Sequence, residues 1–210
     1  MKNFNLILKR TIDFSGSFIG IIIISPVLII IALTIKLSSQ GPVFFQQERL
    51  GKNGKVFKIL KFRTMVVNAE RLGAGLFVKT ENDNRITKIG KLLRATSLDE
   101  LPQLWNVVMG EMSLVGPRPP VPYHPHKLEE YSSFQRKRFE MKPGITGLTQ
   151  VTVRNSVPWD ERIPVDVKYV EKFNIWLDFK ILLNTFLIML RRQSIYTHNN
   201  DKNSSDIKKT

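Results

Sequence analysis

The 210-residue sequence has no cysteine and relatively few acidic residues. The lack of cysteine excludes a disulfide framework, cysteine-ligated zinc and thiol catalysis. The 18 Asp and Glu residues stand against 32 Lys and Arg residues, which gives a formal net charge of +14. A balance this basic suits anionic partners: nucleic acid, an acidic membrane surface or phosphorylated substrates. The chain contains no internal repeat, so its larger part is predicted to form one globular domain.

A run without charged residues, from Phe14 to Ile35, precedes this domain. As a helix, its roughly 22 residues would be about 33 Å long, enough to cross the hydrocarbon core of a bilayer. A cleaved signal peptide is one alternative, but the run is long for its apolar region, and no cleavage site of the usual kind appears before Lys36. The run is therefore predicted to be a membrane segment.

The middle of this run carries Ser25 and Pro26, which disturb a helix. Pro26 has no N–H to donate to the carbonyl of Ile22, and the Ser25 hydroxyl can turn back to a carbonyl three or four residues earlier. Basic residues lie on both sides of the run, and a spanning helix would place one group outside, against the positive-inside tendency. A re-entrant segment, with arms about 18 Å long, keeps both groups in the cytoplasm. A Pro-kinked spanning helix is the alternative.

The rest of the chain is predicted to be a small α/β domain. Residues 1–13 form a basic amphipathic lead-in, and two strands within 41–65 flank Asn53-Gly54, a strong hairpin signal. The segment KPGITG (142–147) is predicted to be a turn, and LTQVTV (148–153) a short strand. Helical patterns occupy five segments: 66–74, 86–95, 102–109, 127–140 and 164–192.

Two adjacent acids, Asp99 and Glu100, are the candidate catalytic residues. Pro102 suits the first position of a following helix. At such a helix start, a carboxylate can act as a nucleophile toward phosphorus, and its neighbour could ligate Mg²⁺. The alternative is a capping box from Ser97 to Glu100, although Pro102 would then fall at the fifth helical position and forfeit a hydrogen bond.

Several basic residues could bind phosphate. Arg118 lies between Pro117 and Pro119, which would pre-aim its bidentate guanidinium, although the segment could also be only a stiff surface turn. Arg94 lies five residues before Asp99 and is a second candidate clamp. On the second predicted strand, Lys61 and Arg63 share one face and could hold a phosphate or lie solvated.

The segment RNSVPWDERIPVDVKYV adds polar and aromatic groups that suit a base or a sugar. The residues are Arg154, Asn155, Trp159, Arg162 and Asp166. Trp159 could equally be an anchor at a membrane interface.

These motifs together resemble the bacterial sugar transferase family, the small monotopic phosphoglycosyl transferases that act on polyprenol phosphate. The resemblance covers nearly the whole chain apart from the tail. Two departures are Val153, where the family usually has Gly, and Glu111, where it usually has Asp. The matching stretches are LKRTIDF, the Ser-Pro pair, GPVFFQQERLGKNGKVFKILKFRTM, LRATSLDELPQLWNVVMGEMSLVGPRPP, KPGITGLTQV and RNSVPWDERIPVDVKYVEKFNIWLDFKIL.

The resemblance implies transfer of a sugar-1-phosphate from a UDP-sugar to undecaprenyl phosphate, with release of UMP, as the first step of bacterial glycoconjugate assembly. It implies an aspartyl-phosphosugar intermediate and Mg²⁺. On the matching positions, Asp99 would be the nucleophile and Glu100 its acidic partner. Both acids are candidate metal ligands, and Arg118 would stabilise phosphate charge. Further expected contacts are Lys61, Arg63, Arg94, Arg154 and Arg162.

The resemblance also implies a location and a domain organisation. Residues 1–38 would form the lead-in and a re-entrant helix broken at Ser25-Pro26, 39–195 a cytoplasmic catalytic domain with interfacial helices, and 196–210 a disordered polar tail. The protein would sit on the inner leaflet of the bacterial cytoplasmic membrane without a nucleic-acid partner, and homo-oligomerisation is open. The competing hypothesis is a non-catalytic, membrane-anchored protein that binds acidic lipid or nucleic acid independently of Asp99.

Overall fold

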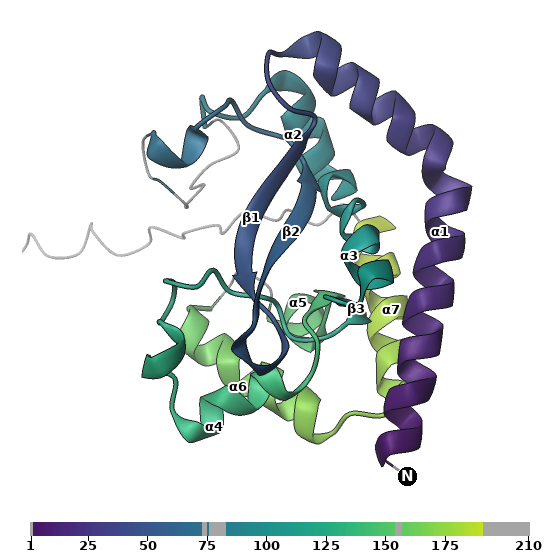
Figure 1. The fold of residues 1–210 in the computed structure, drawn as a ribbon, viewed down its shortest axis with the longest axis vertical. Helices are drawn as coiled ribbons and strands as arrows, with labels where there is room; N and C mark the ends of the chain where they lie inside the picture. The colour runs from purple at the N-terminus through teal and green to yellow at the C-terminus, as the bar shows by residue number, and fades with distance from the viewer. Residues whose placement is uncertain (1, 73–74, 76–82, 154–156, 191–210) are drawn as a thin grey trace, which may run out of the picture.

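The computed structural model describes residues 2–72, 75, 83–153 and 157–190. It confirms a mixed α/β fold with a long N-terminal helix (Figure 1). The elements are α1 (Lys2–Ser38), β1 (Phe44–Leu50), β2 (Val56–Phe62), α2 (Lys88–Ala95), α3 (Gln103–Met109), β3 (Ser113–Val115), α4 (Ser133–Arg136), β4 (Gly144–Thr146), α5 (Leu148–Thr152), α6 (Trp159–Glu171) and α7 (Ile175–Leu190).

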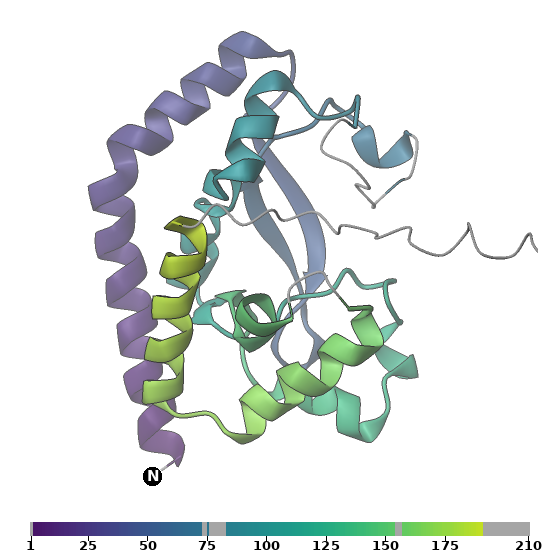
Figure 2. The same cartoon turned by 180° about the vertical axis from the view of Figure 1, so that it is seen from behind.

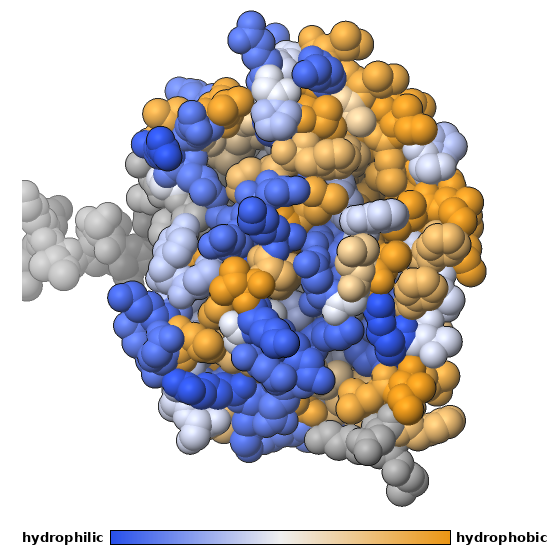
Figure 3. All heavy atoms as spheres, in the orientation of Figure 1, coloured by the Kyte–Doolittle hydropathy of each residue, from blue (hydrophilic) through white to orange (hydrophobic). Residues whose placement is uncertain are grey.

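Helix α1 runs along one side of the molecule and leans over α2 and the hairpin in its upper part (Figure 1). The predicted break at Ser25-Pro26 is not seen, because the helix continues through Pro26. The Ser25 hydroxyl donates to the carbonyl of Ile22 at 2.8 Å, which is the contact that the sequence predicts. In the part of the chain that the structure describes, α1 is the one helix long and apolar enough to cross a membrane. Hydrophobic side chains gather on the α1 side in Figure 3, which fits a membrane-facing surface.

The predicted hairpin is confirmed, with β1 and β2 paired antiparallel. Asn53 and Gly54 both adopt positive φ angles, 56° and 72°, in the connecting turn. One face of β2 packs Phe57 and Ile59 against α3. From its other face, Phe62 joins a core cluster that includes residues of α1 and α2. The hairpin therefore ties the long helix to the rest of the domain.

The predictions for residues 142–153 are wrong. Gly144–Thr146 is strand β4, which pairs in parallel with β3, and Leu148–Thr152 is helix α5. The close approach of the two strands depends on glycine, because a Cβ on Gly144 would lie 2.0 Å from the nitrogen of Gly116. Alternation of β-branched residues suggested a strand for α5, but its Thr149 is instead buried in a tertiary hydrogen bond to Asp166.

Other predicted elements differ in extent. The single helix predicted over 127–140 is interrupted, because Ser132 starts a new helix by capping the N–H of Gln135 at 3.2 Å. Only residues 69–71 of the segment predicted over 66–74 form a helical turn, and 73–74 lie outside the described residues. The last helical segment begins earlier and is split into α6 and α7, and residues 191–210, which include the predicted tail, lie outside the described part.

The first turns of α1 are not a simple surface helix, because their polar side chains are buried against the domain. Lys9 donates to Asp178 of α7 at 2.5 Å. Asp13 accepts hydrogen bonds from Ser113 at 2.7 Å and from the N–H of Leu114 at 3.1 Å. Figures 1 and 2 both show α7 beside this part of α1. Tyr169 also donates a hydrogen bond to Asp178. These side chains are called the α1 network below: Lys9, Asp13, Ser113, Tyr169 and Asp178.

Candidate functional site

The paired acids lie in a short turn between α2 and α3. Residues Leu98–Glu100 form one turn of 3-10 helix after Ser97, which has a positive φ of 56°. The Ser97 side chain makes no capping hydrogen bond, so the capping-box alternative is wrong. Pro102 directly precedes the first residue of α3, one position before the first helical position that the sequence predicts, and its φ of −61° and ψ of −18° are already helical. The turn leaves both acid side chains half-buried.

Strand β2 brings Lys61 to Glu100. The Lys61 ammonium lies 2.6 Å from Glu100 Oε1, and the two side chains are 17% and 25% exposed. Asn106 of α3 fixes the strand at this point, because its amide accepts from the N–H of Leu60 at 3.0 Å and donates to the carbonyl of Lys58 at 2.8 Å. A side chain thus serves as the hydrogen-bonding partner of the β2 edge and sets the position of Lys61.

Glu111, one of the two departures from the family pattern, also belongs to this support. It accepts a hydrogen bond from the Asn106 amide at 2.7 Å. The longer acid therefore occupies a structural position beside the residue that fixes β2.

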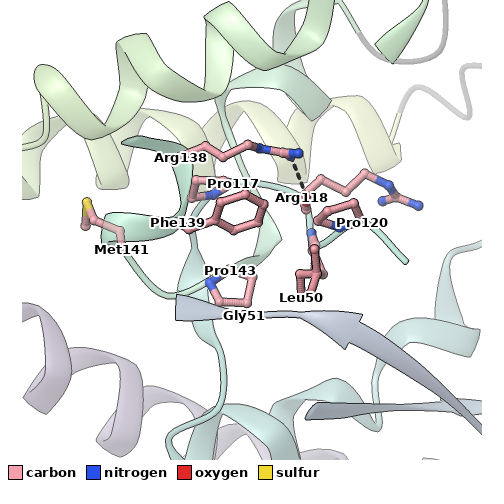
Figure 4. Close-up of a pocket in the computed structure, with 10 residues that line it drawn as sticks. Leu50, Gly51, Pro117, Arg118, Pro120, Arg138, Phe139, Met141 and Pro143 are labelled. Atoms are coloured by element: carbon pink, nitrogen blue, oxygen red, sulfur yellow. Dashed lines mark hydrogen bonds between the residues drawn. The ribbon is translucent and has the colours of Figure 1, made fainter. Parts of the chain in front are cut away.

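The segment around Arg118 is anchored through its backbone carbonyl groups, which accept hydrogen bonds from other parts of the chain. Its prolines have no N–H to donate. The carbonyl of Arg118 accepts from Arg138 at 2.8 Å, as Figure 4 shows, and that of Pro119 accepts from Arg49 at 3.0 Å. Backbone N–H groups donate to the carbonyls of Pro117 and Pro120 at 3.0 and 2.9 Å. All four carbonyls of residues 117–120 are therefore paired, so the guanidinium projects from a rigid base.

The two acids have opposite pKa shifts. Burial raises the pKa of Asp99 to about 6, the negative charge of Glu100 adds to this, and the charges of Lys61 and Arg94 oppose it. Burial also disfavours ionisation of Glu100, but the charges of Lys61 and Arg118, with the hydrogen bond from Lys61, lower its pKa to about 2. Glu100 is therefore ionised at neutral pH, while Asp99 has a pKa closer to neutral. Separated pKa values of this kind are typical of functional acid pairs.

A cavity of about 290 Å³ opens beside Glu100 and Arg118. Its lining includes charged and aromatic side chains as well as apolar side chains from α3 and α7. Its lining residues are Ser97, Glu100, Leu101, Leu104, Arg118, Ile145, Thr146, Thr149, Gln150, Val151, Trp159, Arg162, Asp166, Thr185, Ile188 and Met189.

The predicted base- or sugar-binding group is partly structural. Asp166 lines the cavity but is buried in a 2.6 Å ion pair with Arg138 and also accepts from Thr149. The guanidinium groups of Arg138 and Arg162 lie 5.6 and 5.4 Å from the Trp159 ring centroid, so the indole already stacks with cations. Arg154 and Asn155 lie outside the described residues.

Arg63 and Arg94 are placed differently. Arg63 is buried away from the acids and donates to the backbone and hydroxyl oxygens of Ser39 at 2.9 and 2.8 Å, where it secures the end of α1. Arg94, in the last turn of α2, is close enough to lower the pKa of Asp99.

Sequence reasoning missed two arginines, Arg49 and Arg138. Burial and the nearby charge of Arg118 lower the pKa of Arg49 to about 10. Both residues reach the Arg118 segment only through tertiary contacts. Arg49 lies in the predicted hairpin segment, and Arg138 follows Arg136 and Lys137 in a predicted helix, so the sequence contained no signal that either reaches Arg118.

The long apolar helix suggests a membrane-associated α/β protein, and its acid pair lies among converging basic side chains. The chain belongs to the bacterial sugar transferase family, whose model matches residues 4–192.

Three relatives illustrate the family. Over 199 residues, 90% of the chain, it is 44% identical to the galactosyl transferase CpsE of Streptococcus agalactiae serotype III (strain NEM316). Over 203 residues, 93% of the chain, it is 40% identical to a Klebsiella pneumoniae protein named UDP-glucose:undecaprenyl-phosphate glucose-1-phosphate transferase. The chain spans 43% of the length of each of these two proteins. It is also 39% identical to EpsL, an uncharacterized sugar transferase of Bacillus subtilis (strain 168), with 92% of this chain and 93% of that protein covered.

Proposed function

We propose that the protein is a phosphoglycosyl transferase that moves a sugar-1-phosphate from a UDP-sugar to undecaprenyl phosphate and releases UMP. The observation that carries this proposal is the acid pair: Asp99 and Glu100 are adjacent, have separated pKa values and face converging basic side chains beside a cavity. Membership of the family and the name of the Klebsiella relative support the choice of substrates.

The reaction would proceed by two displacements at one phosphorus atom. The ionised Asp99 carboxylate attacks the β-phosphorus of the UDP-sugar, and the bond from that phosphorus to the bridging oxygen breaks, so UMP leaves. A phosphate oxygen of undecaprenyl phosphate then attacks the same phosphorus, and the bond to Asp99 breaks, which regenerates the carboxylate. Positioning and charge stabilisation supply most of the catalysis in such phosphoryl transfers.

The basic residues would divide this work. Arg118, on its rigid base, would contact the phosphate that gains charge as the bridging bond breaks. Lys61 fixes Glu100 and lowers the pKa of Asp99, which keeps the nucleophile available near neutral pH.

Asp99 and Glu100 would also hold Mg²⁺, which usually takes one or two carboxylates together with substrate phosphates. The two residues fit this role. Lys61 donates a hydrogen bond to Oε1 of Glu100, and within the described residues no side chain donates a hydrogen bond to the Asp99 carboxylate. Those residues contain no cluster of three or more His, Cys, Asp or Glu that could bind a metal alone, so diphosphate oxygens would complete the coordination. The bound ion would neutralise phosphate charge.

The test is replacement of the nucleophile. Asp99→Asn should reduce UMP release from UDP-sugar and undecaprenyl phosphate more than about a thousandfold, because it removes the attacking carboxylate. Asp160→Asn is the matched control, since Asp160 is an exposed acid whose side chain hydrogen-bonds, within the described residues, to His126 and does not line the cavity. Near-normal turnover by Asp99→Asn would contradict the proposal, as would no turnover by the unmodified protein with any UDP-sugar. A panel of UDP-sugars would identify the donor.

For the membrane, we propose that α1 is re-entrant and that the catalytic domain lies on the cytoplasmic face of the bacterial inner membrane. The Ser25-Pro26 pair inside α1 supports this topology, because Pro26 lacks a backbone N–H and the Ser25 hydroxyl already satisfies a carbonyl near the proline. The exposed apolar side chains of α1 provide the membrane surface.

Topology can be measured with tags at the two ends of the chain. In intact cells, both tags should be protected from a membrane-impermeant reagent. Pro26→Leu should expose the N-terminal tag in part of the population, because a helix with its backbone hydrogen bond restored at this position favours spanning. Val27→Leu is the control, since it changes a neighbouring exposed side chain and leaves Pro26 unchanged. An N-terminal tag that is labelled from outside in the unmodified protein would refute the re-entrant course.

A further inference from the structure

Gln150 presents an unused carboxamide at the cavity. It lies in α5 and lines the cavity beside the acid pair, and both polar atoms of its side chain are buried. Neither atom makes a hydrogen bond within the described part of the chain. Buried donors and acceptors are nearly always paired, so a doubly unpaired side chain in a native fold requires an explanation.

Several other buried side chains also have a polar atom that makes no hydrogen bond within the described part of the chain, but none of them lines the cavity. Ser17 and Gln103 are two examples. At Gln150, a donor and an acceptor are unpaired together at the wall of a space that can admit a ligand.

The structure holds this side chain in place. Gly147 precedes α5, and a Cβ there would lie 2.9 Å from Oε1 of Gln150 and 2.1 Å from the carbonyl of Gly116. Only glycine leaves room for both. Thr149, the residue before Gln150, donates a hydrogen bond to the buried Asp166. Asp166 is itself paired with Arg138 at 2.6 Å. The short helix is therefore fixed to a buried ion pair, and Gln150 extends from a rigid support.

Two planar side-chain groups also line this cavity. Trp159 and Arg162 line the same cavity, and the guanidinium lies over the indole ring. Glu100 and Arg118 mark the part of the cavity nearest the phosphate chemistry. With a volume of about 290 Å³, the space is at the small end of ligand pockets, enough for one ring of a donor beside its phosphates.

We propose that the Gln150 carboxamide binds the uracil ring of the UDP-sugar, an assignment that rests on the proposed function. The carboxamide accepts a hydrogen bond from uracil N3–H and donates one to an adjacent ring carbonyl. Uracil presents this donor and acceptor side by side in one plane, and a carboxamide matches them with two parallel hydrogen bonds. A sugar hydroxyl can rotate and does not need such a planar pair. Gln150 would thus select the nucleotide rather than the sugar.

The experiment uses Gln150→Leu in the full-length protein, with UMP as the probe. Loss of two hydrogen bonds should weaken UMP binding, measured by calorimetry, by about ten- to a hundredfold. The KM for two different UDP-sugars should rise by a similar common factor, with little change in kcat. The melting temperature should stay the same or rise, because two unpaired buried polar atoms are removed.

Gln103→Leu is the matched control, because it replaces a second buried glutamine with an unpaired atom outside the cavity lining. It should leave UMP binding unchanged. If Gln150→Leu fails to fold, Gln150→Glu keeps the shape and the acceptor but loses the donor, and should also weaken UMP binding.

Three outcomes separate the possibilities. Unchanged UMP binding in the Gln150 variant would overturn the assignment, and an increase in KM for only one sugar would place Gln150 at the sugar instead. Both results leave the proposed function intact if the unmodified protein releases UMP. No UMP release by the unmodified protein would contradict the proposed function itself.

Discussion

Two polar clusters in the molecule each join a lysine to two carboxylates, yet they are built differently. In the α1 network, Lys9 lies 2.5 Å from Asp178 and 3.7 Å from Asp13. All four carboxylate oxygens there have partners: Ser113 and the N–H of Leu114 donate to Asp13, and Lys9 and Tyr169 donate to Asp178. The three charged side chains are buried.

In the candidate site, the pairing is incomplete. Lys61 contacts only one oxygen of Glu100, and the Asp99 carboxylate receives no side-chain hydrogen bond within the described residues. Both acids are half-buried and Glu100 borders the cavity. This difference shows that residue type alone does not distinguish a structural cluster from a functional one. The distinguishing feature is the hydrogen-bonding capacity that the fold leaves unused.

The largest expected effect follows from breaking the α1 network. Lys9→Met leaves two carboxylates buried without their cation, which should reduce the free energy of unfolding by about 3–5 kcal/mol. Lys61→Met should reduce it by less than about 1 kcal/mol, because that pair is partly exposed to solvent. Chemical unfolding of both variants in the same detergent or nanodisc measures the contrast.

The control for this prediction is the double variant Lys9→Met with Asp178→Asn. Removing the unpaired charge as well should recover part of the lost stability, since the penalty comes from the uncompensated carboxylate. Equal losses for Lys9→Met and Lys61→Met would show that the two clusters do not differ in the way that their hydrogen bonds indicate.

The parts of the fold that the sequence predicts depend on local signals. Asn53-Gly54 specifies the hairpin turn through residues that tolerate positive φ, and Pro102 marks the start of α3. The Ser25 contact with Ile22 is also local, since it spans three residues. Such features depend on neighbouring residues alone, so a single sequence contains the information.

The parts that could not be predicted depend on contacts between distant residues. Lys9 and Asp178 are 169 positions apart, so the amphipathic pattern of the first helix gave no indication that its lysine is buried. Arg63 follows a strand and Arg138 lies in a helical segment, and neither context indicates that the first secures α1 and the second supports Arg118. A polar residue's role is set by the partners that the fold brings to it, and those partners are invisible in its flanking sequence.

The smallest expected effect is the change in the free energy of unfolding when Asp99 is replaced, measured in protein kept free of divalent cations with EDTA. Because burial raises the pKa of Asp99 from 3.8 to about 6, the folded protein resists its ionisation, and the charged form destabilises the fold at neutral pH. Asp99→Asn should therefore increase the free energy of unfolding at pH 7 by about 1 kcal/mol. Asp13→Asn should decrease it, because that carboxylate has all its partners.

The pH dependence tests the sign of this effect. Between about pH 4 and pH 6, the folded state binds more protons than the unfolded state, so the advantage of Asp99→Asn should shrink as the pH falls and vanish below about 4. Thermal unfolding of both proteins between pH 4 and pH 7.5 measures this trend. A stability gain that is independent of pH would exclude ionisation of Asp99 as its cause, and a loss at pH 7 would mean that Asp99 is a structural carboxylate like Asp13.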